Sequence, residues 1–309
     1  MRATETAQTG VIYTTTGNNE RGTVHSYHYK PSPLFLNKSK HRTDIAGLKT
    51  VEQKTAVKFN GNEYESRFTV GFEIEKNQLH RGAVKEYELF CGFERDSSCG
   101  YEAVTHILPL LPNGKWKTKV FDMVLKAEKI IDDRYSPSDR KCGGHITIAC
   151  NGISGDELRQ AVRKNSGIIL AMFRKRLNNA YCGSNRRMQG RNDNVIYNST
   201  SSYSYSNDGW DNKYQTALVK GNCLEFRVPS KFESVKQTMR RYELFYELVN
   251  FSVNNPNGSF KTFLKKIKPI IVSMYNGDES KADEILDLAV HFQKFINDGT
   301  ISDKIQGFL

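Results

Sequence analysis

The stretch spanning residues 67–75 most constrains how this chain folds, because its apolar and polar residues alternate with the two-residue period of a half-buried β-strand. The face predicted to point into the core carries four apolar residues: Phe68, Val70, Phe72 and Ile74. The opposite face carries Glu73 and Glu75, whose carboxylates would lie about 7 Å apart. A divalent metal ion can use that spacing. The alternative interpretation is an ordinary strand face exposed to solvent.

A hairpin is predicted next, and it supplies a third carboxylate. Residues 88–110 contain two short strand-like stretches joined by a turn at residues 96–100, where Asp, Ser and Gly favour a change of direction. Glu102 falls just inside the second strand. Residues 117–132 then predict a helix with one apolar side.

Two later stretches predict strands with further ionisable residues. Residues 142–150 place His145 on a strand that is entered through two glycines, and residues 223–229 place Glu225 and Arg227 on one outward face. If all these strands form one sheet with their polar faces on the same side, four carboxylates, an imidazole and a guanidinium converge. Oxygen-rich sites with one imidazole suit Mg²⁺ or Mn²⁺, whereas zinc favours more His or Cys ligands.

Helical patterns dominate the rest of the chain. Apolar residues recur every three to four positions over residues 155–181, 232–249 and 260–271, and another helix follows a predicted capping box at residues 280–283. These patterns predict an α+β fold. We expect a curved, mainly antiparallel sheet whose polar concave face is the active site, helices on the outer face, and a helical C-terminal part over residues 231–309.

The chain has 309 residues and a formal net charge of +11, which favours polyanionic partners such as nucleic acid or nucleotide phosphates. Much of the excess lies between Leu158 and Asn192, where nine Arg or Lys residues occur without an Asp or Glu. No apolar run is long enough to span a bilayer and no signal peptide is evident, so the sequence predicts a cytoplasmic protein. The six cysteines form no C-x-x-C pair, which favours buried free thiols.

Two segments lack a clear periodic pattern. Residues 1–59 are rich in Thr, Asn, Lys and His and predict a basic N-terminal arm, either flexible or docked on the body or on a partner. Residues 183–213 are rich in Ser, Tyr, Asn and Arg. So long a loop is typical of either a mobile lid over a site or a disordered segment.

Five motifs occur in the order found in the amidoligase family of carboxylate–amine ligases, and the chain resembles that family over roughly residues 66–230. The motifs are Gly71-Phe-Glu-Ile-Glu75, then Asp96-x-Ser98 with Glu102 and the following Pro109-Leu110, then Gly144-His145, Arg174, and Glu225-Phe-Arg227. The resemblance implies that residues 60–230 are a catalytic domain with the fold that glutamine synthetase and glutamate-cysteine ligase share.

The resemblance also implies roles for individual residues. The residues expected to bind more than one Mg²⁺ or Mn²⁺ ion are Glu73, Glu75, Glu102, His145 and Glu225. Arg227 and Glu102 are the expected catalytic residues, and Arg227 is expected to contact the transferring phosphate. Nucleotide or substrate contacts are expected from Asp96, Ser98, Arg174 and Thr147. Relatives commonly carry a second histidine where this chain has Thr147, which leaves the substrate contacts at that position open.

The leading hypothesis is therefore an ATP- and Mg²⁺-dependent ligase that joins the carboxylate of an amino acid, peptide or protein to an amine. The basic residues between Arg159 and Arg191 would help to hold ATP phosphates or an acidic acceptor. Asp208 and Asp211 are candidates for the general base on position alone. The alternatives are an inactive module of the same fold that binds nucleic acid or an assembly, and an amidoligase that acts on nucleic-acid bases. The oligomeric state stays open: some relatives form rings with shared sites, but this sequence contains no interface signal.

Overall fold

The structure, a computed structural model, describes the short strands of residues 2–66 and also residues 68–87, 89–96, 99–105, 108–110, 116–132, 141–150, 153–177, 179, 216–220 and 223–309. The chain forms two compact units. The first comprises Met1–Gly155, Lys220–Glu225 and Lys231–Val235, and the second comprises Asp156–Val219, Phe226–Ser230 and Lys236–Leu309. The division that the sequence predicts, into residues 1–59, 60–230 and 231–309, stays a prediction.

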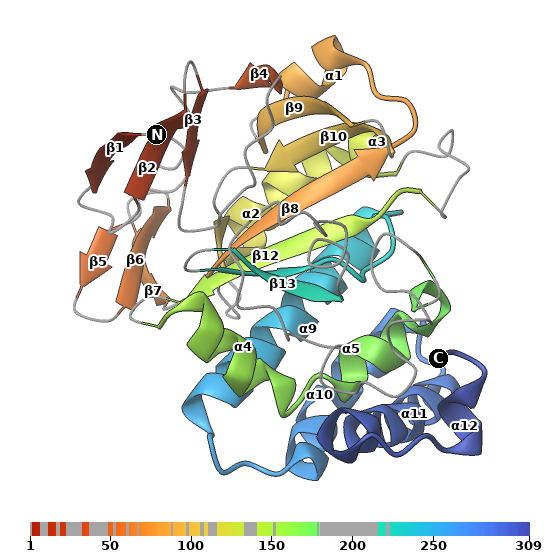
Figure 1. Ribbon diagram of the computed structural model, residues 1–309. Helices are drawn as coiled ribbons and strands as arrows, with labels where there is room; N and C mark the ends of the chain where they lie inside the picture. The colour runs from red at the N-terminus through yellow and green to blue at the C-terminus, as the bar shows by residue number, and fades with distance from the viewer. Residues whose placement is uncertain are drawn as a thin grey trace, which may run out of the picture. The chain divides into compact units, whose positions relative to one another are not determined.

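The N-terminal residues contain two small antiparallel sheets (Figure 1). The strands of the first are β1 (Arg2–Thr6), β2 (Ile12–Thr16) and β3 (Asn19–Gly22). The strands of the second are β5 (Lys49–Val51), β6 (Lys54–Phe59) and β7 (Asn62–Ser66). The segment predicted to be a basic arm therefore contains β-strands, and its role as an arm stays a prediction.

The main sheet of the first unit is built around β8 (Phe68–Lys76), which Figure 1 shows as a long central strand. Five of its other strands are β14 (Cys223–Phe226), β12 (Gly144–Cys150), β10 (Gly100–Thr105), β9 (Phe90–Asp96) and β4 (Pro33–Leu36). They lie in the order β14-β12-β8-β10-β9-β4, and the short β11 (Leu108–Pro109) also pairs with β8. The pairs of β8 with β12 and β10, and of β10 with β9, are antiparallel. The prediction of an α+β fold with an antiparallel sheet is confirmed.

Both faces of β8 are buried along its whole length. On the apolar face, the Phe72 ring meets the Phe232 ring edge to face, with 5.4 Å between the ring centroids. Phe72 lies between the part of β8 that pairs with β10 and the part that pairs with β11. Its N–H donates to Thr105 Oγ1 at 3.0 Å. The prediction of a half-buried strand is thus wrong, and so is the alternative of a solvent-exposed polar face. On the polar face, the neighbouring strands place Glu102 beside Glu75 and His145 beside Glu73.

Two of the predicted helices are interrupted in the structure. Residues 117–132 form α2 (Trp116–Lys126) and α3 (Glu128–Ile131), and α1 (Arg81–Lys85) precedes them in the same unit. The long helix predicted over residues 155–181 is wrong as one element. It consists of α4 (Gly155–Arg163), α5 (Gly167–Met172) and a 3₁₀ helix (Arg174–Arg176).

The break before α5 follows from hydrogen bonds that compete with the helical pattern. Ser166 Oγ donates to the Val162 carbonyl oxygen at 2.7 Å. The Gly167 N–H donates at 2.9 Å to Oε1 of Gln293, a residue far along the chain, and not to a carbonyl of α4. The Asn165 side chain also bonds to a residue outside α4 and α5: its Nδ2 donates to Ser252 Oγ of α9 at 2.9 Å. The chain therefore turns at this point, although its apolar spacing continues.

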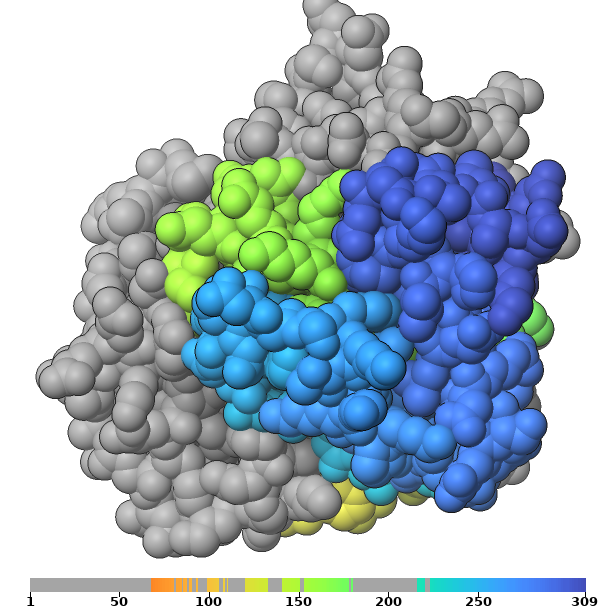
Figure 2. Space-filling model, turned by 90° about the horizontal axis from the view of Figure 1, so that it is seen from below, coloured from red at the N-terminus to blue at the C-terminus, as the bar shows by residue number. Residues whose placement is uncertain are grey.

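The second unit is mainly helical. Its remaining elements are β13 (Ala217–Lys220), α9 (Val235–Asn254), α10 (Phe260–Met274), α11 (Glu279–Asp298) and α12 (Asp303–Gln306). Helix α5 packs against α11, which also contacts α10 and α12 (Figure 1). Figure 2 shows α4 in green and α10 and α11 in shades of blue on one face of this unit. Within the described part of the chain, no helix has the length and apolar character needed to cross a membrane.

Asp278, not Ser280, caps the N-terminus of α11, so the capping box predicted at residues 280–283 is wrong. The Asp278 side chain accepts a hydrogen bond from the Lys281 N–H at 2.9 Å. Replacing Asp278 with Ala is expected to destabilise the protein by about 1 kcal/mol, because this N–H loses its acceptor. Ser280→Ala, inside the helix, should change stability by less than about 0.5 kcal/mol. Chemical denaturation measures both variants, and equal losses would contradict the assigned cap.

Candidate functional site

The register of the main sheet places four ionisable side chains next to one another. His145 on β12 lies directly opposite Glu73 on β8, and Glu102 on β10 lies directly opposite Glu75. Directly opposite residues of antiparallel strands have Cβ atoms about 4.5–5.5 Å apart and point to the same face. Because Glu73 and Glu75 share one face of β8, the four side chains gather on that face. The predicted convergence of these residues is therefore found in the structure.

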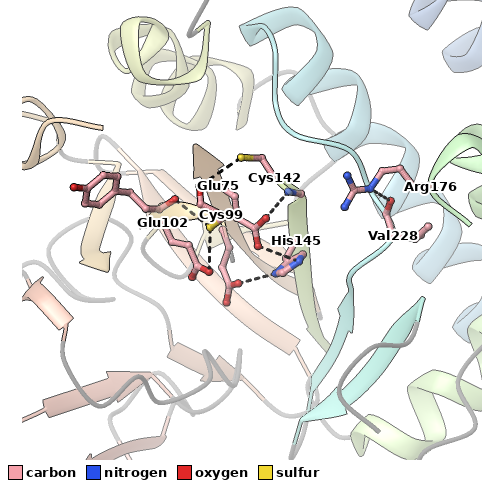
Figure 3. Close-up of polar contacts among 10 residues, drawn as sticks. Glu75, Cys99, Glu102, Cys142, His145, Arg176 and Val228 are labelled. Atoms are coloured by element: carbon pink, nitrogen blue, oxygen red, sulfur yellow. Dashed lines mark hydrogen bonds and ion pairs between the residues drawn. The ribbon is translucent and has the colours of Figure 1, made fainter. Parts of the chain in front are cut away.

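His145 bridges the two carboxylates of β8, and Figure 3 shows its ring beside Glu75. Its Nδ1 lies 2.8 Å from Glu73 Oε2, and its Nε2 lies 3.3 Å from Glu75 Oε1. The other oxygen of Glu75 accepts a hydrogen bond from the Gly143 N–H. All three side chains are buried, with no more than 5% of each residue exposed.

The geometry around His145 favours a cation. A neutral imidazole that donates its Nδ1–H to Glu73 directs the lone pair of Nε2 toward Glu75. A lone pair and a carboxylate oxygen 3.3 Å apart repel one another unless a proton or a metal ion lies between them. A divalent ion satisfies both atoms and also offsets the repulsion between buried carboxylates.

A second group of potential ligands shares Glu75 with the first. It consists of Glu75, Cys99 and Glu102, whose ligand atoms all lie within 4.8 Å of one another. Cys99 Sγ lies 3.9 Å from Glu102 Oε1, and both residues are buried (Figure 3). The sequence interpretation missed Cys99. Its position in the hairpin turn, three residues before Glu102, is the signal that could have identified it.

The donor atoms of these groups fit a divalent cation. Three carboxylates and one imidazole are the ligands that Mg²⁺ and Mn²⁺ use in proteins, and burial of three carboxylates is costly unless cations or protons neutralise them. The oxygen and nitrogen donors of these groups come from Glu73, Glu75, Glu102 and His145, and Cys99 adds a sulfur to the second group. Glu75 belongs to both groups, so its carboxylate would contribute to both candidate cation positions.

Glu225, the fifth predicted ligand, lies on β14, the neighbour of β12, and is fully buried. Neither of the two ligand groups found among the described residues includes it. Its role as a ligand therefore stays a prediction.

Arg227 lies just beyond the end of β14, because this strand stops at Phe226 and does not continue to residue 229 as predicted. The backbone turns there: the Arg227 N–H donates to the Thr216 carbonyl oxygen at 2.9 Å. Two buried arginines hold the residues that follow. Arg176 Nε donates to the Val228 carbonyl oxygen at 3.1 Å (Figure 3), and Arg241 Nη2 donates to Ser230 Oγ at 2.7 Å. Arg227 is itself 5% exposed and belongs to the second unit.

The described side-chain contacts of Arg174 lie within its own unit. Its Nη1 donates to the Ala171 carbonyl oxygen of α5 at 3.0 Å, and its other contacts are with C-terminal residues. Its Nη2 lies 3.6 Å from Glu284 Oε1, and its guanidinium carbon lies 5.6 Å from the centre of the Phe308 ring. Burial raises the pKa of the nearby Tyr275 hydroxyl, although the positive charge of Arg174 acts in the opposite direction. The predicted contact of Arg174 with nucleotide or substrate stays a prediction.

Of the remaining predicted site residues, the structure describes the side chain of Thr147 but not those of the others. Thr147 is buried on β12 directly opposite Gly71, two positions from the His145–Glu73 pair. Asp96 is the last residue of β9, but its side chain lies outside the described part of the structure. Ser98, Asp208, Asp211 and the loop of residues 183–213 also lie outside the described residues.

Comparisons with known proteins do not assign the chain to a family. No protein-family model matches the sequence, and no curated protein matches it. The functional argument therefore depends on the chemistry of the site.

Proposed function

We propose that this protein is an ATP- and Mg²⁺-dependent carboxylate–amine ligase. One observation carries the proposal: the side chains of Glu73, Glu75, Glu102 and His145, which come from three adjacent strands, form one buried group of metal-ligand type. The order of the motifs along the chain supports the finer proposal that the sheet has the arrangement of the glutamine synthetase catalytic domain. Burial of several carboxylates is costly, and a bound cation offsets that cost.

The residues of the chain would bind and orient the reactants. A divalent ion held by the carboxylates would neutralise the phosphates of ATP as the γ-phosphoryl group is transferred. Glu73 orients the His145 ring through Nδ1, which leaves Nε2 available as a ligand. Arg227 would contact the transferring phosphate, and the bonds from Arg176 and Arg241 hold the backbone on its C-terminal side. The site thus supplies charge and position, and it needs no protein nucleophile.

The proposed reaction has two steps. The substrate carboxylate attacks the γ-phosphorus of ATP, the bond to the β-phosphate oxygen breaks, and ADP and an acyl phosphate result. The amine nitrogen then attacks the acyl carbon, the bond to the phosphate oxygen breaks, and inorganic phosphate leaves while a base takes the proton of the amine. The carboxylate of an amino acid, peptide or protein is the proposed first substrate, and an amine is the second.

A thermal unfolding experiment with Mg²⁺-ATP tests the proposal without knowledge of these substrates. ATP at about 100 times its dissociation constant should stabilise the wild-type chain by roughly 2.7 kcal/mol, and only when Mg²⁺ is present. Arg227→Ala should lose most of this shift, because it removes a positive charge from the phosphates. Arg240→Ala is the matched control, since Arg240 is only part-buried and pairs with Glu243 on α9. A shift with DNA or RNA but none with Mg²⁺-ATP would contradict the proposal and support the binding-module alternative.

A further inference from the structure

The second ligand group differs from the first in one atom type. The first group offers carboxylate oxygens and imidazole nitrogen, whereas Glu75, Cys99 and Glu102 offer two carboxylates and a sulfur. Cys99 Sγ lies 3.6 Å from the Tyr101 carbonyl oxygen and 3.9 Å from Glu102 Oε1. Only 2% of Cys99 is exposed, so solvent cannot substitute for these neighbours. The thiol therefore sits among oxygen atoms that a cation could share with it.

The distances suit a single ion bound by sulfur and oxygen. With bonds of about 2.3 Å to sulfur and about 2.0 Å to oxygen, a tetrahedral zinc ion holds the two ligand atoms about 3.5 Å apart. The present separation of Cys99 Sγ and Glu102 Oε1, 3.9 Å, would have to shorten by only about 0.4 Å. A change of side-chain torsion angles suffices for that, and the strand backbone need not move.

We propose that Glu75, Cys99 and Glu102 form a cation position that binds a borderline-soft divalent ion of the zinc class, with Cys99 as a thiolate ligand. Sulfur ligands favour such ions over Mg²⁺, which prefers oxygen and keeps much of its water. Binding forms a metal–sulfur bond and releases the thiol proton to solvent. The inference goes beyond the ligase proposal, because it concerns cation binding in the absence of ATP.

Cys142 provides a matched comparison, since it is also a buried free thiol in the same unit. Its Sγ donates to Asn77 Oδ1 at 3.2 Å and lies 3.8 Å from the backbone oxygen of Cys99. It belongs to neither ligand group among the residues that the structure describes. Replacing it with Ser should therefore leave the cation position intact.

A titration of the full-length chain with Co²⁺, without ATP, tests the proposal. Co²⁺ takes the place of zinc, and a cobalt–thiolate bond gives a charge-transfer absorption in the near ultraviolet. We expect this band in the wild type and in Cys142→Ser but not in Cys99→Ser, together with a loss of Zn²⁺ affinity of roughly 10-fold or more in Cys99→Ser alone. Glu102→Gln keeps the thiol but removes a carboxylate ligand, so it should weaken Co²⁺ binding. This variant tests the proposal if Cys99→Ser does not fold.

Three results would overturn the proposal: no charge-transfer band in the wild type, a band that persists in folded Cys99→Ser, or equal loss in Cys142→Ser. The ligase proposal fails separately, through the absence of a stabilising shift with Mg²⁺-ATP. A chain with that shift and no cobalt band retains the ligase proposal alone. A chain with the band and no ATP shift retains the zinc-class site alone.

Discussion

Glu75→Gln is expected to abolish metal-dependent ATP binding while the chain remains folded. Glu75 is the one carboxylate that belongs to both ligand groups, so its loss weakens both cation positions at once. Loss of a residue that only orients a metal ligand typically lowers metal affinity 10- to 100-fold, and removal of a ligand itself should cost at least as much. We therefore expect the affinity for Mn²⁺ to fall by at least roughly 100-fold, as measured by calorimetric titration.

The fold should survive because Gln is nearly isosteric with Glu. Its side-chain oxygen can still accept the hydrogen bond from the Gly143 N–H. The change also removes one of three negative charges that lie close together, so repulsion in the metal-free protein decreases. The metal-free variant should unfold at the same temperature as the wild type or at a higher one. A metal-binding defect accompanied by a lower unfolding temperature would instead indicate a damaged fold.

Glu128→Gln is the control for this experiment. It makes the same chemical change at an exposed position of α3 in the same unit, and Glu128 belongs to neither ligand group. Its Mn²⁺ affinity and unfolding temperature should match those of the wild type. If Glu75→Gln binds Mn²⁺ as tightly as Glu128→Gln does, the assignment of the metal site is wrong.

The predictable part of the site is the part that strand periodicity determines. A two-residue period places Glu73 and Glu75 on one face of β8 whatever the strand packs against. The same reasoning applies to His145 on β12. That His145 lies opposite Glu73 depends on the register between two strands far apart in sequence, and no local pattern specifies that register. The burial of the polar face is likewise not specified by the local pattern, since alternation alone predicts a half-buried strand.

The role of Cys99 was not predictable in the same way. A lone cysteine in a turn most often acts as a small buried apolar residue. No C-x-x-C pair includes Cys99, so the sequence lacks the usual signal of a thiolate metal site. The hairpin brings its sulfur near Glu102, and the pairing of β10 with β8 adds Glu75 to the group. The ligand set thus depends on tertiary pairing, whereas its individual carboxylates follow from local patterns.

The helices show the same limit. Apolar spacing correctly predicts that residues 155–181 are largely helical, since spacing reports which face is buried. The break at Gly167 depends on Gln293, a residue of α11 that spacing within α4 and α5 does not reveal. The cap of α11 was missed for a local reason. Asp278 and Ser280 are both good capping residues two positions apart, and only the hydrogen bond to the Lys281 N–H distinguishes them.

Gly167→Ala is expected to destabilise the protein by about 2–3 kcal/mol, because α5 and α11 meet at this residue without space for a side chain. A Cβ atom at Gly167 would come within 2.7 Å of Gln293 N and 2.8 Å of Gln293 Cβ, and it would also meet the backbone oxygen of Ala289. Backbone atoms of a packed helix cannot rotate away as a side chain can. Alanine favours a helix over glycine by only about 0.5–1 kcal/mol, which is less than the cost of the clash.

Gly307→Ala separates the effect of the clash from the general effect of replacing glycine. At Gly307 the φ angle is −70° and a Cβ atom would meet nothing within 4 Å, so Ala fits without strain. This control should be neutral or stabilising by about 0.4–1 kcal/mol, since Ala restricts the unfolded chain more than Gly does. Thermal unfolding should therefore move in opposite directions, with Gly167→Ala lower by roughly 3–5 °C. If both variants unfold at the wild-type temperature, α5 and α11 are not in the close contact that explains the break before α5.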